Sequence, residues 1–327
     1  MKAVLLVGGM GTRLRPITYR LPKPLVPIMG KPLIMHVIDS LPPEVSEIII
    51  PMGYKRDMME EYLLKNGPRR KVTLVEEHEP MGTGGAVKNV EEYLDGQFLV
   101  INGDIIASID IAKFIAFHRQ KGGIASISLW PVVDPSPYGV AQIDDNDRIT
   151  RFQEKPKKEE AFSNLINAGA YALEEEVLSY IGKGFVSMER DVFPNLLDDG
   201  MYGFRFDGYW VDCGRRESVL EAHWRLMGEQ MQSVSRDSVS SGAVLAKPLV
   251  IEEGAVVAGA TIGPRAFVSR RAVVGLRSEV AGSVLLEDAR VGARCKIIDS
   301  MVDSGYVVPD GVEVRSQILS NARPPEE

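Results

Sequence analysis

The sequence predicts an α/β domain built on a mainly parallel sheet, followed by a smaller domain of short, stacked strands. Three observations lead to this prediction. Short apolar runs alternate with amphipathic stretches over the first two-thirds of the chain, closely spaced strand-like runs follow, and aliphatic residues then recur every six positions. An alternating βαβα rhythm is typical of a parallel sheet flanked by helices.

The alternating part predicts a Rossmann-like sheet. Ligands of such sheets bind outside the carboxyl ends of the strands, so we expect a site in the loops that follow these runs. The expected strands are Ala3–Val7, Glu47–Pro51, Val72–Val75, Phe98–Asn102 and Ile124–Trp130, and the expected helices are about Pro32–Leu41, Lys55–Lys65, Thr83–Leu94 and Ile111–Lys121.

From about Pro137 the strand-like runs follow one another closely. A helix over about Arg215–Met231 then precedes a serine-rich stretch with few apolar residues, a composition typical of a linker. We therefore expect a domain at 1–232, a linker at 233–242, and a domain at 243–327 that holds the repeats and a C-terminal tail. The expected strands of this part are Tyr138–Asp144, Arg148–Glu154, Ile166–Leu173, Tyr202–Phe206 and Tyr209–Cys213.

Aliphatic residues recur with a period of six after the linker, and a small or β-branched residue stands four positions after each early one. This period fits neither a helix nor an isolated strand, but it fits a coil of short parallel strands with one inward aliphatic residue each. The pattern resembles the hexapeptide repeat of left-handed parallel β-helices. The expected inward residues are Val250, Val256, Ile262, Val268, Val274 and Val280 and, after one-residue slips, Val291, Ile297, Val302, Val308 and Val314.

Composition limits the classes of function. Of the 327 residues, 45% are hydrophobic and 25% charged, which favours a packed core over disorder. The formal net charge of −7 argues against a nucleic-acid partner, which requires clustered lysine and arginine. The cysteines, Cys213 and Cys295, predict neither a disulfide framework nor a zinc site, and a cytoplasmic location fits. No membrane partner is expected, because no run approaches the roughly 20 apolar residues that span a bilayer and the start does not resemble a signal peptide.

The first expected strand runs into a glycine-rich loop over Gly8–Arg13. Glycines let backbone N–H groups approach phosphate oxygens closely, and Arg13 adds a cation. The loop departs from the dinucleotide-binding fingerprint at Leu14, and no Gly-Lys-Ser/Thr follows as a P-loop would require. Further on, Pro22 and Pro24 restrict the backbone around Lys23 and would preset its side chain.

These features resemble the signature of the sugar-phosphate nucleotidylyltransferase family, which reads LVGGMGTRLRP and then PKPLVP in this chain. Further motifs stand in the family's order over nearly all of residues 1–232, and a hexapeptide-repeat tail is common in the family. Each motif is short, but the ordered set is specific. The further motifs are Pro80–Gly85, Asn102–Asp104, Tyr138–Val140, Glu154–Pro156, Asn167–Gly169 and Trp210–Asp212.

The resemblance implies a role for each matching residue. The nucleotide phosphates would be bound by Gly8, Gly9, Gly11, Thr12, Arg13 and Lys23. The base and ribose would lie near Gly82 and Thr83, and Mg²⁺ would be held by Asp104 and Asp212. The sugar 1-phosphate would contact Gly139, Glu154, Lys155 and Asn167, with Glu154 at the hydroxyls and Lys155 at the phosphate.

The two aspartates also suit a metal on physical grounds. Asp104 follows the apolar run Phe98–Ile101, and Asp212 follows the aromatic run Tyr209–Val211, so each is expected at the carboxyl end of a strand. Magnesium usually takes one or two carboxylates together with substrate phosphates. Two aspartates on neighbouring strand ends would meet that requirement.

These parts predict that a sugar 1-phosphate attacks the α-phosphorus of an NTP and that pyrophosphate leaves. The nucleophile is already anionic near neutral pH, so no general base is required. The protein would align two anions and neutralise their charge. The expected catalytic residues are Arg13, Lys23, Asp104, Lys155 and Asp212.

The first loop and the segment Ser187–Pro194 resemble the branch of the family that uses GTP and mannose 1-phosphate. Glu79 is a candidate carboxylate for the N1–H and N2–H donors of guanine. UTP or dTTP with glucose 1-phosphate is the alternative pair of substrates. Two positions depart from the usual pattern: Gly84 replaces alanine near the base, and Arg215 replaces threonine near Asp212.

Two other functions are compatible with this fold. A β-helix acyltransferase generally uses a histidine, but the last histidine, His223, precedes the repeats. A non-catalytic subunit that binds an NDP-sugar would have lost some of the five catalytic residues, all of which are present. We interpret the repeats as structural. A short β-helix has open ends, so we expect a homo-oligomer formed through this domain.

Overall fold

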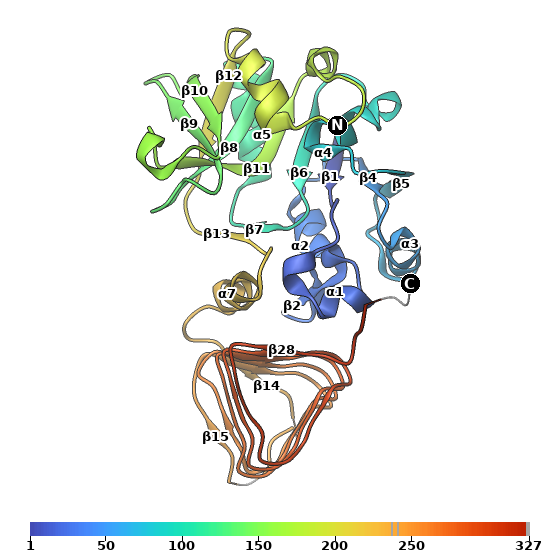
Figure 1. The fold of residues 1–327 in the computed structure, drawn as a ribbon, viewed down its shortest axis with the longest axis vertical. Helices are drawn as coiled ribbons and strands as arrows, with labels where there is room; N and C mark the ends of the chain where they lie inside the picture. The colour runs from blue at the N-terminus through green and yellow to red at the C-terminus, as the bar shows by residue number, and fades with distance from the viewer. Residues whose placement is uncertain (237, 241, 325–327) are drawn as a thin grey trace. The chain divides into compact units, whose positions relative to one another are not determined.

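The computed structural model describes residues 1–236, 238–240 and 242–324 (Figure 1). The chain forms two compact units, each made of separate segments. The sheet unit combines Met1–Gly9 with Ile34–Trp210, and the β-helix unit combines Met10–Leu33 with the chain from Val211 onward. The segment 10–33, which carries most of the signature loop, therefore belongs with the repeats. The expected division at residues 232 and 242 does not foresee this exchange.

The sheet unit is built on a mixed sheet whose strands β1, β4, β5 and β6 run parallel, as predicted. Strand β11 runs antiparallel to β6 and continues the sheet toward β9 and β10. The order is β10 (Ile149–Glu154), β9 (Gly139–Ile143), β11 (Leu165–Leu173), β6 (Phe98–Asn102), β1 (Lys2–Leu6), β4 (Glu47–Met52) and β5 (Lys71–Glu76), with β8 (Ala125–Pro131) beside β11 and β12 (Met201–Arg205) beside β8.

Both faces of the central strands are buried. Successive residues of β1 and β6 point to opposite faces, yet Ala3–Leu5 and Phe98–Val100 have no exposed surface. Such burial is typical of an α/β sheet covered by helices. Helix α4 packs against β1, and α5 packs against β8, β11 and β12 (Figure 1). The helices are α2 (Leu33–Ser40), α3 (Arg56–Asn66), α4 (Gly82–Lys88), α5 (Ile111–Lys121), α6 (Phe193–Leu196), the 3-10 turns η3 (Glu91–Tyr93), η4 (Lys158–Glu160) and η5 (Glu175–Tyr180), and the π-helix η6 (Met188–Val192).

In the β-helix unit, the described strands after helix α7 (Arg216–Met227) stack into parallel sheets, and β16 pairs with β19 seventeen residues later, Leu249 with Ala266. The predicted short left-handed parallel β-helix is thus confirmed (Figure 1). One sheet contains β14 (Gln232–Val234), β16 (Leu249–Ile251), β19 (Ala266–Val268), β22 (Ser283–Leu285), β25 (Met301–Val302) and β28 (Ile318–Leu319). A second contains β15 (Val244–Leu245), β18 (Thr261–Ile262), β21 (Glu279–Ala281), β24 (Lys296–Ile298) and β27 (Glu313–Arg315). A third contains β17 (Val256–Val257), β20 (Val273–Val274), β23 (Arg290–Val291) and β26 (Val307–Val308).

The inward residues of the first coil differ from the prediction. Val256 is 50% exposed and Val250 is not part of the interior cluster, whereas Ile251 and Val257 are. A coil of 17 residues contains two steps of six and one of five, so a strict period of six slips by one residue there, whereas the 18 residues from Thr261 to Glu279 keep the period. The other predicted inward residues are confirmed: Ile262, Val268, Val274, Val280, Val291, Ile297, Val302, Val308 and Val314.

Two boundaries also differ. Helix α7 ends at Met227, short of the predicted Met231, because Gly228 adopts a positive φ of 69° that stops the helix. Strand β14 pairs in parallel with β16, so part of the expected linker contributes to the first coil. Residues 237 and 241 of that linker lie outside the described residues. None of the helices within the described ranges is long and apolar enough to cross a bilayer.

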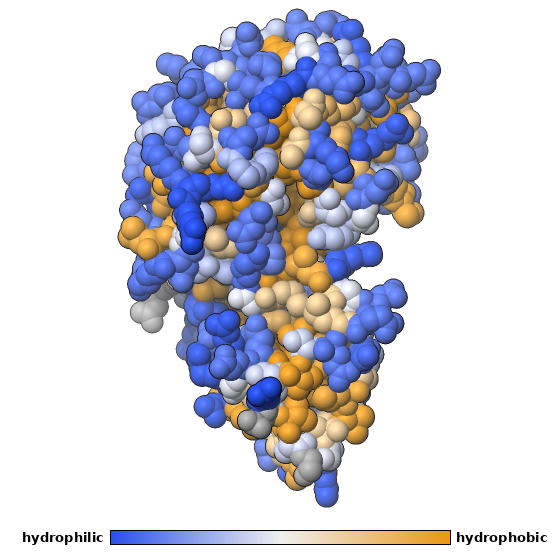
Figure 2. Space-filling model, turned by 180° about the vertical axis from the view of Figure 1, so that it is seen from behind, coloured by the Kyte–Doolittle hydropathy of each residue, from blue (hydrophilic) through white to orange (hydrophobic). Residues whose placement is uncertain are grey.

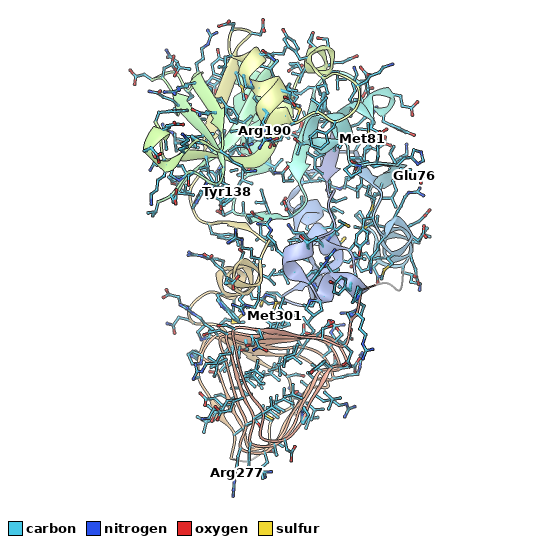
Figure 3. The ribbon with its side chains drawn as sticks, in the orientation of Figure 1. Glu76, Met81, Tyr138, Arg190, Arg277 and Met301 are labelled. Carbon is cyan, nitrogen blue, oxygen red and sulfur yellow. The ribbon has the colours of Figure 1, made fainter. Side chains whose placement is uncertain are left out.

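One outer face of the β-helix is covered by α7 and by the segment 10–33. Phe267 of β19 and Met301 of β25 are buried although they do not belong to the interior cluster, and Met301 is labelled in Figure 3. The ring of His223 in α7 lies 5.3 Å from that of Phe267. Arg20, which ends helix α1 (Ile17–Arg20), donates hydrogen bonds to the buried carboxylate of Asp303. The β-helix is therefore the support on which the segment 10–33 rests.

The buried interior of the β-helix predicts a specific loss of stability. Ile297 is fully buried there, so Ile297→Ala should lower the free energy of unfolding by about 2–5 kcal/mol through lost contacts and a residual cavity. Leu64 of α3 is 83% exposed, and Leu64→Ala should change it by less than about 0.5 kcal/mol. Urea unfolding of both variants measures the difference, and equal effects would contradict the inward assignment of Ile297.

Candidate active site

Strands β1 and β6 are parallel neighbours, so the residues that follow them meet at one edge of the sheet. The register pairs Leu6 with Asn102, and the Gly103 N–H donates to the Leu6 carbonyl at 2.8 Å. Gly8–Gly9 follow β1, and Asp104 lies in the turn after β6. The start of the glycine-rich loop and the first predicted metal ligand are therefore brought to the same edge, as the strand-end rule predicts.

Strand β11 brings Asn167 to the same edge, because it runs antiparallel to β6 and its residue Ala170 pairs near the end of β6. Gly169 has a φ of 81°, and a Cβ there would lie 2.7 Å from Asn102 Nδ2, so this position requires glycine. Asn102 Oδ1 is buried without a hydrogen-bond partner among the described residues. The end of β6 thus holds a spare acceptor next to the predicted metal ligand, a feature that the motif alone does not reveal.

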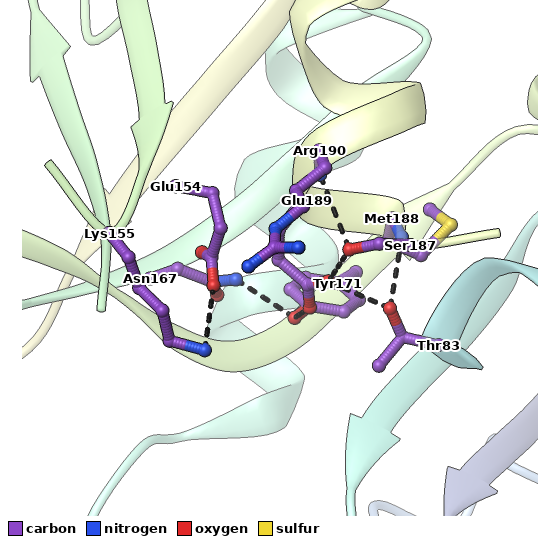
Figure 4. A network of polar contacts seen from close by, with 9 residues as sticks. All are labelled: Thr83, Glu154, Lys155, Asn167, Tyr171, Ser187, Met188, Glu189 and Arg190. Atoms are coloured by element: carbon purple, nitrogen blue, oxygen red, sulfur yellow. Dashed lines mark hydrogen bonds and ion pairs between the residues drawn. The ribbon is translucent and has the colours of Figure 1, made fainter. Parts of the chain in front are cut away.

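A hydrogen-bonded network centred on Glu189 joins three elements (Figure 4). The Glu189 carboxylate in η6 accepts from Thr83 Oγ1 of α4 at 2.7 Å, from Tyr171 OH of β11 at 3.2 Å and from Ser187 Oγ at 2.8 Å. Asn167 Nδ2 donates to Tyr171 OH at 2.9 Å. Burial, followed by the Glu189 charge, raises the pKa of Tyr171 well above its usual value, which keeps the hydroxyl protonated. The network thus connects the residue predicted near the ribose with one predicted at the sugar.

Glu154 pairs with Gly139 at the end of the β9–β10 pair, and Lys155 follows Glu154. Figure 4 shows Glu154 and Lys155 side by side. Lys155 has a positive φ of 47°, and its Nζ lies 3.1 Å from Glu154 Oε1. A Cβ at Gly139 would lie 3.0 Å from Glu154 Oε2 and 2.7 Å from Phe152 Cζ, so glycine leaves room for the carboxylate. Burial raises the pKa of Glu154 above its usual value, against the opposing effect of Lys155. The structure therefore gathers most of the residues predicted at the sugar phosphate.

Helix α4 begins with the glycines of the PMGTGG motif. Gly82 has a φ of 71°, and the N–H groups of Gly84 and Gly85 donate to the Val186 carbonyl at 2.8 and 3.1 Å. A Cβ at Gly84 would lie 2.9 Å from Val186 Cγ1. The glycine that replaces the more usual alanine therefore permits close packing of the loop before η6, and this loop in turn carries the residues around Glu189.

Glu77 lies beside the glycine-rich loop. Its Oε1 accepts the Met81 N–H at 2.9 Å, and its Oε2 lies 3.8 Å from the position of a Cβ at Gly8. Glu79, the predicted carboxylate for the base, is exposed in the following loop. Glu77 comes directly after β5, and Asp104 stands two residues after β6. A carboxylate just after a parallel strand is the sequence signal that could have identified Glu77 as a candidate site residue.

In the β-helix unit, the signature loop is held by local contacts. Thr12 and Arg13 are exposed in the 3-10 turn η1 (Thr12–Leu14), while Leu14 is 1% exposed and anchors the turn. Gly11 has a φ of 60°, and a Cβ there would lie 3.1 Å from Lys23 Cβ. Lys23, in the turn η2 (Lys23–Leu25) between its prolines, is only 9% exposed. Gly11 and Lys23 are thus packed against each other, while Thr12 and Arg13 remain exposed.

Asp212, at the end of β13 (Trp210–Asp212), lies near Arg13 within the same unit. A Cβ at Gly214 would be 2.6 Å from Arg13 Nη2 and 2.9 Å from Asp212 Oδ1, so the guanidinium and the carboxylate flank one glycine. Within the described ranges, no cluster of three or more His, Cys, Asp or Glu side chains forms a metal cage. Carboxylates next to strand ends, such as those of Asp104 and Asp212, suit a hard divalent cation that completes its shell with water and phosphate oxygens.

Comparison with known proteins decides the family. Residues 2–228 match the family model described as "Nucleotidyl transferase", and residues 232–322 match one described as "GlmU-like, C-terminal hexapeptide". The chain belongs to the nucleotidyl transferase family. It is thus an enzyme of the sugar-1-phosphate nucleotidyltransferase type that the ordered motifs predict.

Individual relatives cover most of the chain. A probable mannose-1-phosphate guanylyltransferase 1 of Oryza sativa subsp. japonica is 36% identical over 312 residues, which span 92% of this chain and 86% of the relative. The bifunctional protein GlmU of Methanocaldococcus jannaschii is 33% identical over 327 residues, 92% of this chain and 77% of the relative. The crystal structure of HddC from Yersinia pseudotuberculosis complexed with GMP-PN aligns with a TM-score of 0.57 at 32% identity, covering 68% of this chain and 97% of that chain.

The network around Glu189 predicts a loss of stability in a variant that keeps the shape of Thr83. The Thr83 hydroxyl donates to Glu189 and accepts the Met188 N–H at 2.9 Å. Thr83→Val removes both hydrogen bonds and should lower the free energy of unfolding by about 1–3 kcal/mol, because their partners stay partly buried. Thr83→Ser, which keeps the hydroxyl, should cost less in the same urea-unfolding measurement. A Val variant as stable as the Ser variant would contradict the network.

Proposed function

We propose that this nucleotidyltransferase makes GDP-mannose and pyrophosphate from GTP and mannose 1-phosphate. The observation that carries the choice of substrates is the 36% identity, over 92% of this chain, with a rice protein named as a probable mannose-1-phosphate guanylyltransferase. A solved relative that carries GMP-PN adds support for a guanosine nucleotide. The chemistry rests on the residues gathered at the edge of the sheet and in the signature loop.

In the proposed reaction, the chain binds and aligns two anions. Gly8 and Gly9 at the end of β1, with Gly11 and Thr12 in the continuing loop, would present backbone N–H groups to the nucleotide phosphates. Arg13 and Lys23 would neutralise the leaving pyrophosphate. Lys155 would hold the attacking phosphate, while Glu154, Gly139 and Asn167 would surround the sugar. Gly82 and Thr83 would lie near the base and ribose.

We further propose that Asp104 and Asp212 hold Mg²⁺. Both are half-buried carboxylates next to strand ends, and they offer the hard oxygen donors that this ion prefers. When bound, the ion would neutralise phosphate charge and orient the reacting groups. The attacking oxygen is anionic near neutral pH, so the residues need only position it and stabilise the developing charge.

A grid of substrates tests the proposal directly. Pyrophosphate release is measured with GTP, UTP, dTTP, ATP and CTP, each crossed with mannose, glucose and N-acetylglucosamine 1-phosphates. We expect turnover with GTP and mannose 1-phosphate, and a fall in kcat of about 10²-fold or more in Asp104→Asn and in Lys23→Ala. Lys65→Ala removes an exposed lysine of α3 and should leave kcat unchanged.

Other outcomes of the grid identify the alternatives. Turnover with UTP or dTTP and glucose 1-phosphate would contradict the proposed substrates but keep the class of reaction. Absence of turnover in a folded protein that still binds an NDP-sugar would indicate a regulatory subunit. A near-normal kcat in either variant would remove that residue from the mechanism.

We propose that the Glu77 carboxylate recognises guanine, in place of Glu79, the candidate that the sequence suggests. A carboxylate accepts from the N1–H and N2–H groups of guanine, whereas uracil has a carbonyl oxygen where guanine carries the N2 amino group. The support for Glu77 is its position beside Gly8 and at the start of α4, whereas Glu79 is exposed.

The two glutamates make a matched pair of variants. Glu77→Gln should lower kcat/KM for GTP by about ten-fold or more relative to UTP, on the scale of a lost hydrogen bond to a charged group. Glu79→Gln should leave this ratio within two-fold of the wild type. The reverse result would assign base recognition to Glu79, and equal ratios in all three proteins would exclude both.

We also propose that the enzyme is a homo-oligomer joined through its β-helix. Figure 2 shows apolar side chains on the surface of the β-helix, in the lower part of the view. Val244, Val256, Leu276 and Val307 are each at least 50% exposed there. Val256 and Val307 belong to the same sheet and lie in one column with Val273 and Arg290, so a second copy that packs on this sheet could cover both valines.

Light scattering on the eluting protein tests the assembly. We expect a mass of at least twice the 36.0 kDa of one chain at micromolar concentration, because the exposed valines lose water on association. Val256→Glu with Val307→Glu should reduce the mass to that of a monomer, while Val133→Glu, at a fully exposed site in the sheet unit, should not. A monomeric wild type would contradict the proposal.

A further inference from the structure

A pocket within the β-helix unit is lined by four arginines. Its volume of about 570 Å³ lies within the range of about 300–1,000 Å³ that is typical of small-molecule sites. The lining combines the signature loop, the start of α7 and the last coil of the β-helix. The residues that matter here are Arg13 and Arg15 from the loop, Arg215, Arg216 and Glu217 from α7, and Gln317 from the coil.

The pocket has an excess of positive charge. Within the described residues, Arg13, Arg15 and Arg215 make no ion pair, while Arg216 pairs with Glu217, the one carboxylate of the lining. Arg15 and Arg215 therefore add positive charge to a space that also contains the Arg13 guanidinium, whose charge the nearby Asp212 carboxylate partly offsets. Such an arrangement raises the electrostatic potential of the pocket and attracts anions.

The same wall offers hydrogen-bond donors. The Arg216 side chain is 15% exposed, and its Nε is buried without a hydrogen-bond partner among the described residues. Helix α7 begins there, and its N-cap residue, Arg215, makes no side-chain cap. The first N–H groups of a helix are unpaired within it and favour anions. The start of α7 thus offers the pocket both positive charge, from Arg215 and Arg216, and N–H donors that are unpaired within the helix.

We propose that this pocket binds a small anion with two or more linked phosphate groups, at a site that shares only Arg13 with the proposed reaction. Planar guanidinium groups bind phosphate oxygens in pairs, and the excess positive charge of the pocket suits a ligand with several negative charges. Arg15, Arg215 and Gln317 have no role in the proposed reaction. Arg215, which replaces the more usual threonine, acquires a function here.

Arg13 couples the pocket to the signature loop. Its guanidinium lines the pocket and also flanks Gly214 together with Asp212. An anion in the pocket competes for this guanidinium, so its presence raises the KM for the NTP. This consequence rests on the proposed function, whereas binding of the anion does not.

Calorimetric titration of the full chain tests the site, with glucose 1,6-bisphosphate and tripolyphosphate as separate probes. The two probes distinguish phosphate esters from a polyphosphate chain, and 150 mM salt suppresses weak surface binding. We expect one probe to bind the wild type at one-to-one stoichiometry. Arg215→Gln with Arg216→Gln should weaken binding at least ten-fold. Arg225→Gln, at an exposed arginine of the same helix, and Lys23→Ala should change it less than two-fold.

A second variant changes a residue of the last coil of the β-helix, which also lines the pocket. Gln317→Glu adds a carboxylate without removing an arginine and should also weaken binding at least ten-fold, with thermal unfolding as the check of folding. With probe present, the KM for GTP should rise in the wild type and stay constant in Gln317→Glu. The proposal is overturned if neither probe binds, if both pocket variants bind like the wild type, or if Lys23→Ala abolishes binding. Calorimetry measures binding of the probe without catalysis, so it tests the pocket even if the protein shows no turnover.

Discussion

The parallel pairing of β1 with β6 is the constraint on which the candidate site depends. Because Leu6 pairs with Asn102 and accepts the Gly103 N–H, the glycine-rich loop and Asp104 must leave the sheet at the same edge. Strand β11 runs antiparallel beside β6 and so brings Asn167 to that edge from the opposite direction. Buried apolar residues fill both faces of these strands, and a slip of one residue in register would turn them toward the wrong face.

The β-helix has a second structural role, because it supports the segment that carries Arg13 and Lys23. Arg20 donates to Asp303, whose carboxylate is 2% exposed and also accepts from Ser320. Asp303 is buried, so loss of Arg20 would leave its charge without a cation, which is destabilising. Apolar residues also take part in this support: Phe267 and Met301 are buried on the outer face of the β-helix, where α7 and the segment 10–33 cover it. The repeats are part of the support for the signature loop.

Much of this fold could be predicted from the sequence. Strand β6 and helix α5 have their predicted bounds, because each carries a clear period and ends at a turn or a cap, such as Asp110 before α5 and Gly122 after it. The first coil of the β-helix was less predictable, because one step in three takes five residues. A strict period of six therefore selects Val256, which is exposed, over Val257, which is buried.

The candidate site could be predicted only in part. Motifs identify Asp104, Glu154 and Lys155, since these residues follow strands in a recognisable order. Glu189 has no such signal, because its importance comes from Thr83 and Tyr171, which lie far away in the sequence. Likewise, the membership of the segment 10–33 in the β-helix unit follows from packing and not from any local pattern.

The most direct test of the account is whether the carboxylate at the end of β6 holds the metal. Mn²⁺, as a spectroscopic substitute for Mg²⁺, is titrated into the protein with GTP present, and the free ion is followed by electron paramagnetic resonance. We predict that Asp104→Asn weakens Mn²⁺ binding at least ten-fold, whereas Asp110→Asn, at the cap of α5, leaves it unchanged. Equal affinity in the wild type and in Asp104→Asn would contradict the role assigned to this edge of the sheet.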